Sequence, residues 1–263
     1  MVRPVIALLS DFGTRDHYAG AMKGVALGIC PEVTFVDITH DIPPHDALAG
    51  ALELGAAYRY FPPGTIFLVV VDPGVGSARR SLAAEAGGHR FVAPDNGVLT
   101  LVFKETPPTR VVELTEPRYA RPTVSRTFEG RDRFAPAAAW LARGIDLSGL
   151  GCALTSWHTL TVPEPALSSD GIVGDVLRVD RFGNLVTNVD RRTFERFAGG
   201  GGVEILAGDQ AVGTVVATYA DAEPGAVCAL FGSSEHLEVA VNGASAAERL
   251  DLARGARVTI RRA

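Results

Sequence analysis

The sequence predicts an α/β domain with a mostly parallel sheet, followed by a smaller antiparallel β-barrel domain. Strand and helix patterns alternate through the first half, which is typical of βαβ units with helices on both faces of a sheet. In the second half, short runs of Val, Ile and Leu are separated by glycine-containing turns, which indicates a small antiparallel barrel. Two prolines and a loss of periodicity between Val162 and Ser169 place the domains at 1–162 and 170–263.

The expected elements follow the hydrophobic patterns in order. In the first domain we expect strands at 4–10, 33–38, 65–72 and 110–114, helices at 17–30, 45–60 and 133–143, and a hairpin at 81–93. In the second domain we expect strands at 171–180, 184–188, 202–206, 212–217, 226–231, 236–241 and 257–261, with short helices near 191–197 and 245–250.

Composition narrows the class of partner. The net charge of −5 comes without a basic cluster, which argues against nucleic acid because phosphate neutralisation needs grouped Lys and Arg. A small-molecule partner is therefore expected. No apolar stretch approaches the roughly 20 residues that span a bilayer, and the short apolar run at the N-terminus meets Ser10 and Asp11 without a cleavage pattern. We therefore expect a cytoplasmic protein that makes no use of a membrane.

The cysteines indicate neither a disulfide framework nor a metal site. Cys30, Cys152 and Cys228 lie far apart and lack CxxC spacing. We expect all three to be small buried hydrophobic residues, and no metal is predicted.

The stretch from Leu68 to Arg80 carries the strongest chemical signal. Its apolar β-branched run predicts a buried strand, and the following Pro73, Gly74 and Gly76 force a turn. Asp72 then lies at the carboxyl end of a strand, where open α/β sheets bind ligands, and Arg79 is near enough to fold back over the loop. A turn that Asp72 caps, with Arg79 in solvent, is the alternative.

A second polar loop follows the first strand. Asp11 and Asp16 supply two carboxylates, which suit a ligand with vicinal hydroxyls or an ammonium group. Asp16 as a helix N-cap is the alternative. Neither GxGxxG nor GxxxxGK[ST] is present, so the sequence lacks the usual signatures of a dinucleotide-binding or P-loop phosphate site.

Three further segments combine charge, amides or hydroxyls with turns. Glu129 lies in a charged junction before a helix, and a solvated face is the alternative there. Phe182 beside Asp180 and Asn184 can stack on a flat heterocycle while an amide contacts a purine edge, although alone the segment would pass for a β-turn. The turn at Ser233 and Ser234 offers hydroxyls and amides to a carboxylate.

Taken together, these motifs resemble one family, the S-adenosyl-L-methionine (SAM) hydroxide adenosyltransferases, or SAM hydrolases, which are relatives of fluorinase and chlorinase. The motifs occur in family order along nearly the whole chain: SDFGTRDHYAGAMKG, THDIPP, VVDPGVGSARR, FVAPDNG, FEGRD, DRFGNLVTN and SSEHLEVAVN. The resemblance implies an α/β domain and a β-barrel in a homotrimer, with active sites between neighbouring subunits. It also implies attack of water or hydroxide on C5′ of SAM, giving adenosine and methionine, with SAM as substrate and no cofactor.

The resemblance also implies roles for the residues that match its motifs. Asp11 would bind the ribose hydroxyls and Asp16 the methionine ammonium. Asp180, Phe182 and Asn184 would contact adenine and the amino acid, and Ser233 and Ser234 the methionine carboxylate. The family's catalytic Asp and Arg correspond to Asp72 and Arg79, but its His is replaced by Glu129.

The replacement leaves two functions open. As a hydrolase, the protein would orient a water through Asp72, and we expect Arg79 to hold Asp72 and lower its pKa. We also expect Arg131 to pair with Glu129. The alternative is a non-catalytic protein that binds SAM or adenosine. Halogenation is disfavoured because Asp72 would repel an anion, and the halogenating relatives lack this carboxylate.

Overall fold

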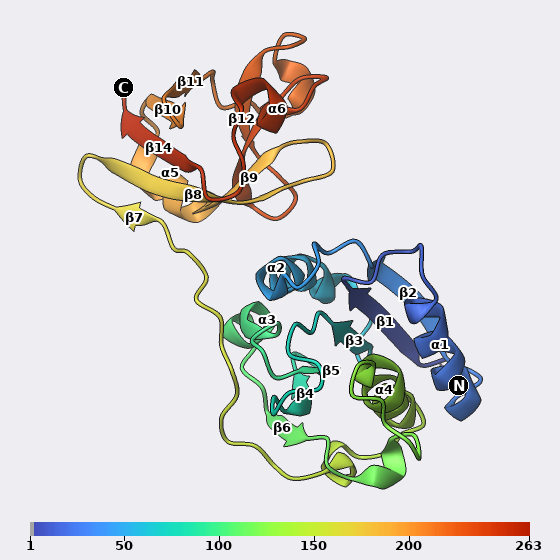
Figure 1. Cartoon of the computed structure of the whole chain (residues 1–263). Coiled ribbons are helices and arrows are strands. Elements are labelled where there is room, and N and C mark those ends of the chain that lie inside the picture. Colours follow the sequence, from blue (N-terminus) through green and yellow to red (C-terminus); the bar gives the residue numbers. More distant parts are fainter. Residues whose placement is uncertain (1–2) are drawn as a thin grey trace. The chain divides into compact units, whose positions relative to one another are not determined.

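The computed structural model describes residues 3–263, which form two compact units that divide between Thr161 and Val162 (Figure 1). The helices and strands of the first unit are β1 (Val5–Ser10), α1 (Tyr18–Ile29), β2 (Thr34–Thr39), α2 (Ala47–Ala57), β3 (Ile66–Val70), β4 (Ser81–Ala86), β5 (His89–Pro94), α3 (Thr100–Glu105), β6 (Arg110–Glu113) and α4 (Ala135–Ala142). A π-helical turn, η3 (Gly130–Phe134), leads directly into α4. Single 3₁₀ turns lie at η1 (Tyr58–Tyr60), η2 (Pro117–Tyr119) and η4 (Leu147–Leu150).

The first unit is built on one sheet with the order β2-β1-β3-β5-β4-β6. β1 pairs in parallel with both β2 and β3, and β3 pairs in parallel with β5, whereas β4 runs antiparallel to β5 and β6. The predicted α/β class with a mostly parallel sheet is therefore confirmed. Because the chain leaves β1 for β2 on one side and β3 lies on the other, a topological switch point separates β1 from β3.

Helices cover both faces of this sheet (Figure 1). Ile6 and Leu8 of β1 belong to a buried cluster that includes residues of α1 and α4. Ala7 and Leu9 of the same strand point to the opposite cluster, which includes residues of α2 and α3. A strand buried on both faces explains the continuous apolar runs in the sequence, since neither side of the strand meets water.

The second unit is an all-antiparallel β-structure. Its elements are β7 (Ala166–Leu167), β8 (Gly171–Val179), β9 (Leu185–Asp190), α5 (Arg191–Ala198), β10 (Val203–Ala207), β11 (Gln210–Val212), η5 (Tyr219–Asp221), β12 (Val227–Phe231), β13 (His236–Val241), α6 (Ala246–Leu250) and β14 (Arg257–Arg262). The strands follow the order β11-β10-β14-β8-β9-β13-β12, with β7 added beside β8. A bridge between Val215 and Ala229 nearly closes the sheet, so the predicted barrel is confirmed.

The expected strand at 212–217 is wrong. β11 ends at Val212 because the chain turns at Gly213, whose N–H donates to the Val227 carbonyl. The residues that follow then meet β12 only at the bridge between Val215 and Ala229. The alternating apolar residues in this segment therefore help to close the barrel and do not form a regular strand.

The sequence pattern does not reveal the short helix α3, because six residues are too few to show a helical period.

One expectation about the cysteines is wrong. Cys152 is exposed, whereas Cys30 and Cys228 are buried as expected. The burial of Cys228 raises the pKa of its thiol above the ordinary value, which keeps this sulfur protonated and unreactive near neutral pH.

Helix ends follow local capping rules. Asp46 accepts a hydrogen bond from the Ala49 N–H at the start of α2, and Asp190 accepts one from Thr193 at the start of α5. Gly199 takes the left-handed conformation that ends α5. By contrast, the N-cap of α1 is His17, and its side chain makes no capping bond. Asp16 is therefore not the N-cap of α1, and the alternative interpretation of that residue is wrong.

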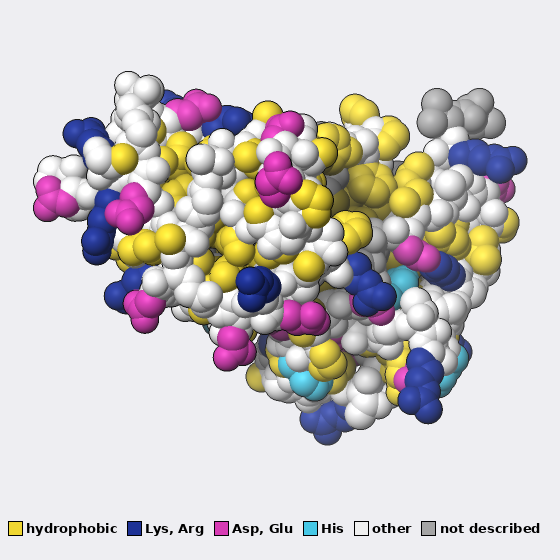
Figure 2. Space-filling view, turned by 90° about the horizontal axis from the view of Figure 1, so that it is seen from above, with side chains coloured by type: hydrophobic (Ala, Val, Ile, Leu, Met, Phe, Trp, Pro, Cys, Tyr) yellow, Lys and Arg dark blue, Asp and Glu magenta, His cyan; other side chains and the backbone are white. Residues whose placement is uncertain are grey.

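The surface carries charges of both signs. On the face that Figure 2 shows, Lys and Arg side chains are interspersed with Asp and Glu rather than gathered into one patch. In residues 3–263 no helix is long and apolar enough to cross a membrane.

Gly76 lies where the loop after β3 packs against the segment that contains Arg126. Its φ is +77°, and an added Cβ would lie 2.3 Å from the Arg126 carbonyl oxygen. Gly88, in the β4–β5 turn, has nearly the same φ of +78° but open space around it. Substitutions at these two glycines therefore distinguish the cost of backbone strain, which both share, from the cost of a steric clash, which only Gly76 has.

We expect Gly76→Ala to destabilise the protein more than Gly88→Ala does. The Gly88 variant should lose about 1–2 kcal/mol of unfolding free energy, which is the cost of left-handed backbone in an L-residue. The Gly76 variant pays that cost and also displaces the 125–128 segment. Urea unfolding of both variants measures the difference, and equal losses would contradict this interpretation of the packing.

Candidate active site

The loop after β3 brings Asp72 and Arg79 together in a two-pronged ion pair. Arg79 Nε donates to Asp72 Oδ1 at 2.9 Å, and Nη2 donates to Oδ2 at 2.5 Å. The loop is closed by turn bonds from Val75 N–H to the Asp72 carbonyl and from Ser77 N–H to the Gly74 carbonyl. The alternative with Arg79 in solvent is wrong, because the side chains are only 10% and 6% exposed for Arg79 and Asp72.

Glu129 reaches the same pair from a distant part of the chain. Gly130, which follows it, packs so closely against β3 and α1 that an added Cβ would lie 3.1 Å from Met22 Sδ and 3.3 Å from Val70 Cγ1. This approach brings the Glu129 carboxylate to Arg79, whose Nη2 donates to Glu129 Oε2 at 2.9 Å. The Glu129 side chain is 14% exposed, so the solvated-face interpretation is wrong.

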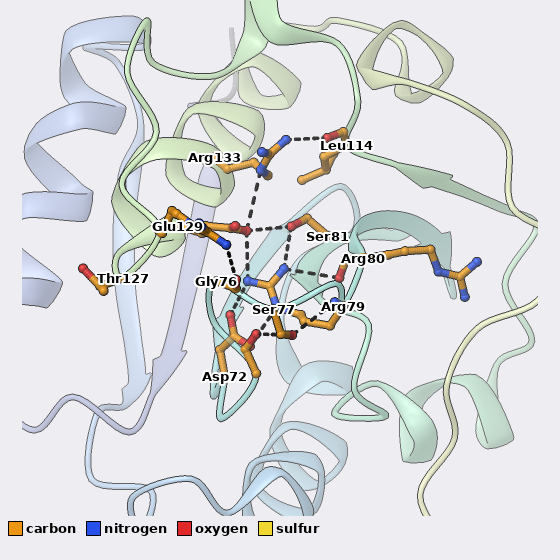
Figure 3. Close-up of polar contacts among 12 residues, drawn as sticks. Asp72, Gly76, Ser77, Arg79, Arg80, Ser81, Leu114, Thr127, Glu129 and Arg133 are labelled. Carbon is orange, nitrogen blue, oxygen red and sulfur yellow. Dashed lines mark hydrogen bonds and ion pairs between the residues drawn. The ribbon is translucent and has the colours of Figure 1, made fainter.

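Two more side chains complete this network (Figure 3). Ser81 Oγ accepts from Arg79 Nη1 at 2.7 Å and donates to Glu129 Oε2 at 3.0 Å. Arg133 places Nε 3.6 Å from the same Oε2 and donates from Nη1 to the Leu114 carbonyl at 2.8 Å. Sequence reasoning missed both residues, although the spacing of four between Glu129 and Arg133 was a usable signal.

The expected pairing of Arg131 with Glu129 is wrong. Arg131 donates to both carboxylate oxygens of Asp132, at 2.7 and 2.8 Å, and its guanidinium lies over the Phe128 ring. Residues two apart on a helical turn point in different directions, whereas residues four apart share a face. Arg133 therefore faces Glu129, and Arg131 faces away.

Burial dominates the electrostatics of Asp72. Loss of solvation raises the pKa of Asp72 above its ordinary value of 3.8, even though the ion pair with Arg79 lowers it, and the charge of Glu129 raises it further. The expectation that Arg79 lowers this pKa is confirmed, but burial outweighs the ion pair and the net shift is upward. The sequence does not show how completely the pair is buried. A raised pKa makes this carboxylate a better proton acceptor than an ordinary aspartate.

The loop after β1 lies beside the loop after β3, since Ser10 pairs with Val70 at the ends of the two strands. Asp11 Oδ2 accepts the N–H of His45 at 2.8 Å. Ser10 is fully buried and its Oγ lies 2.7 Å from His40 Nδ1, which fixes the start of this loop. The structure thus places Asp11 and Asp72 at neighbouring strand ends, at the switch point of the sheet.

Aromatic side chains connect the first loop to the Glu129 segment. The Phe12 ring centroid lies 5.8 Å from that of Phe128 and 5.3 Å from that of Tyr18. Tyr18 and Phe128 are in turn 5.1 Å apart. Asp16 lies exposed in the same loop and makes no hydrogen bond to any residue in the range 3–263, so its carboxylate is available to a ligand.

The second unit holds a separate polar cluster. Asp180 Oδ1 accepts from the Phe182 and Asn184 N–H groups, and its Oδ2 accepts from the Asn184 side chain, all at 2.9 Å. Tyr219 donates to Glu238 at 2.9 Å, and its hydroxyl oxygen lies 3.4 Å from the Asn184 amide. Burial and the bond to Glu238 raise the pKa of Tyr219 to about 12, so its hydroxyl stays protonated and donates at neutral pH.

The remaining predicted binding residues are all in turns of this unit. Phe182 is 78% exposed, which is unusual for a large aromatic ring and leaves its face open for stacking. Ser233 and Ser234 lie between β12 and β13, and the buried Oγ of Ser234 has no hydrogen-bond partner among the described residues. The sequence missed Tyr219 and Glu238, whose contacts form only when separate segments meet in the barrel.

No group of three or more His, Cys, Asp or Glu side chains within residues 3–263 is arranged to hold a metal ion. In the first unit, the candidate site consists of the carboxylates of Asp72 and Glu129 and the guanidinium groups of Arg79 and Arg133, with Ser81 bonded to Arg79 and Glu129. Such an arrangement can hold and polarise a water molecule, because an ionised carboxylate that accepts from arginine keeps further lone pairs free.

The comparisons with known proteins agree over both units. A family model described as the SAM hydroxide adenosyltransferase N-terminal domain matches residues 6–151, and one described as the C-terminal domain of the same family matches residues 174–259. A Thermus thermophilus protein named (R)-S-adenosyl-L-methionine hydrolase is 42% identical, with 97% of this chain and 98% of that protein covered. A Nocardia brasiliensis protein named fluorinase is 33% identical, with 98% and 97% covered.

A solved structure has the same fold. The crystal structure of a Thermotoga maritima protein, described as an uncharacterized conserved protein, matches with a TM-score of 0.93 at 34% identity. The match covers 98% of this chain and all of that one (100%). With both family models matched along the chain, the protein belongs to the SAM hydroxide adenosyltransferase family.

Proposed function

We propose that this chain hydrolyses SAM to adenosine and L-methionine. The observation that carries the proposal is the buried Asp72, held on both oxygens by Arg79 at the switch point of the sheet. The relatives named as SAM hydrolases, at 36–42% identity, support the substrate.

Hydrolysis of SAM depends more on positioning the water molecule than on acid catalysis. The sulfonium of SAM leaves C5′ with the bonding electron pair as a neutral thioether, so no proton need be supplied to it. A water molecule forms the new O–C5′ bond and loses a proton, which Asp72 accepts and passes to solvent. The protein must therefore hold the water in line with the C5′–S bond.

Each residue of the network has a role in this step. Asp72 accepts a hydrogen bond from the water, and its raised pKa favours proton transfer to it. Arg79 fixes the carboxylate through two bonds and acts as a positioning residue. Glu129 Oε2 takes all the contacts to Arg79, Ser81 and Arg133, so that Oε1 can receive the same water.

Substrate contacts are proposed from the loops. Asp11 would bind the ribose hydroxyls and Asp16 the methionine ammonium. Asp180, Phe182 and Asn184 would contact adenine and the amino acid, with Ser233 and Ser234 holding the methionine carboxylate. Because these residues are divided between the two units, we propose that a homotrimer forms each site from two neighbouring subunits.

Incubation with SAM and chromatography of the products tests the function directly. Adenosine and methionine should form in equal amounts. No adenosine above the buffer control, at protein concentrations near that of SAM, would refute hydrolysis.

A non-catalytic SAM-binding protein is the second candidate, favoured by Glu129 in place of the family's histidine. Calorimetry showing tight SAM binding without turnover would support it, and a 5′-chloro nucleoside formed only with chloride would indicate halogenation instead.

Asp72→Ala should lower kcat at least about 100-fold, as loss of a general base commonly does. Glu129→His should keep the fold and raise kcat severalfold, because an imidazole accepts protons near neutral pH. Steady-state rates and circular dichroism of both variants decide the matter. If Asp72→Ala keeps nearly full activity and Glu129→His matches wild type, neither side chain contacts the nucleophile.

The pH dependence of kcat should reflect the raised pKa of Asp72. Only the ionised carboxylate accepts a proton, so kcat should fall as the pH drops through this pKa, which lies above 3.8. Glu129→Gln removes a negative charge that raises the pKa of Asp72, and it should move this acid limb to lower pH. Glu105→Gln, which changes an exposed pair with Arg59, should leave it in place.

Shared sites predict complementation between subunits. Asp72→Ala alters the α/β unit and Asn184→Ala the barrel unit, so each homotrimer alone should be nearly inactive. Mixed trimers would contain some sites with both residues intact and should recover part of the wild-type rate. Mixtures that stay inactive after verified subunit exchange would rule out the shared site.

A further inference from the structure

We infer that Arg133 is a positioning residue, whose guanidinium neutralises Glu129 so that Arg79 stays committed to Asp72. The kinetic part of this inference rests on the proposed hydrolysis. Its structural basis is the arrangement of charges around the Glu129 carboxylate (Figure 3).

One guanidinium nitrogen serves two carboxylates. Arg79 Nη2 donates to Asp72 Oδ2 at 2.5 Å and to Glu129 Oε2 at 2.9 Å. All three side chains are at most 14% exposed, so water does little to separate the two negative charges. Without another cation, the network would carry a net negative charge, which is costly in a poorly solvated place.

Arg133 supplies the missing positive charge. Its Nε is buried, has no hydrogen-bond partner among residues 3–263, and lies 3.6 Å from Glu129 Oε2. The other end of the guanidinium is anchored by the bond from Nη1 to the Leu114 carbonyl at 2.8 Å. With Arg133 in place, the Asp72, Arg79 and Glu129 cluster is electrically balanced.

Ser81 orients the Glu129 carboxylate relative to Arg79. Arginine only donates, so the bond from Arg79 Nη1 makes Ser81 Oγ an acceptor and directs the hydroxyl proton to Glu129 Oε2. Glu129 is therefore held on one oxygen by Arg79 and Ser81, with Arg133 close to the same atom. If Arg133 were removed, Glu129 would attract the Arg79 guanidinium more strongly, and the hydrogen bonds from Arg79 to Asp72 would weaken.

The kinetic test compares Arg133→Met with Arg133→Lys. Arg133→Met should lower kcat about threefold or more, the size of coupling seen between contacting charged groups, while KM for SAM stays within about twofold. Arg133→Lys keeps the charge and should restore most of kcat. Arg118→Met, at an exposed arginine paired with Glu116, is the matched control and should change neither constant.

A double-mutant cycle distinguishes pairing from general structural support. In the Glu129→Gln background, Arg133→Met should change kcat less than about twofold, because the charge it neutralises is gone. Equal losses in both backgrounds, or a loss that Arg133→Lys does not restore, would overturn the inference.

Thermal unfolding supplies a readout that needs no activity. Arg133→Met should lower the unfolding midpoint by about 2–6 °C in the wild-type background and by less than half as much in the Glu129→Gln background. Equal shifts would refute the charge pairing. If wild type fails to hydrolyse SAM, the proposed function fails, and the thermal cycle still decides whether Arg133 neutralises Glu129.

Discussion

The bidentate ion pair between Asp72 and Arg79 is the interaction on which the candidate site depends. Two buried charges are stable only when each meets the other at close range and the remaining donors and acceptors are satisfied. Arg79 achieves this with two bonds to Asp72, one to Glu129 and one to Ser81. The loop after β3, the start of β4 and the segment before α4 are consequently held together by one guanidinium.

Two features of the fold bring these segments together: the pairing of neighbouring strands and close packing at glycines. Parallel strands β1 and β3 end side by side, so the carboxylates that follow them face the same edge. Close packing at Gly76 and Gly130 lets the 125–134 segment approach the loop after β3. A side chain at Gly76 would clash with the Arg126 backbone, and one at Gly130 would crowd Met22 and Val70.

Local patterns in the sequence predict the strand-to-loop positions of Asp11 and Asp72, because a strand followed by Pro and Gly fixes where a side chain emerges. The partner of Glu129 was mispredicted because pairing depends on the direction of side chains around a π-helical turn. The Tyr219–Glu238 bond was beyond local reasoning, since it joins segments that become neighbours only when the barrel forms. The degree of burial that raises the pKa of Asp72 is likewise a property of the whole packed unit.

Glu129 sets the electrostatics of the site, compared with the histidine that the resemblance to SAM hydrolases implies at this position. A neutral imidazole would leave Arg79 with Asp72 as its sole anionic partner in this network, whereas Glu129 adds a negative charge that raises the pKa of Asp72. This repulsion makes the Asp72 carboxylate more basic. The same repulsion would weaken the clamp if nothing opposed it. Arg133 and Ser81 oppose it by holding Glu129 on one oxygen, so that Arg79 keeps both of its bonds to Asp72.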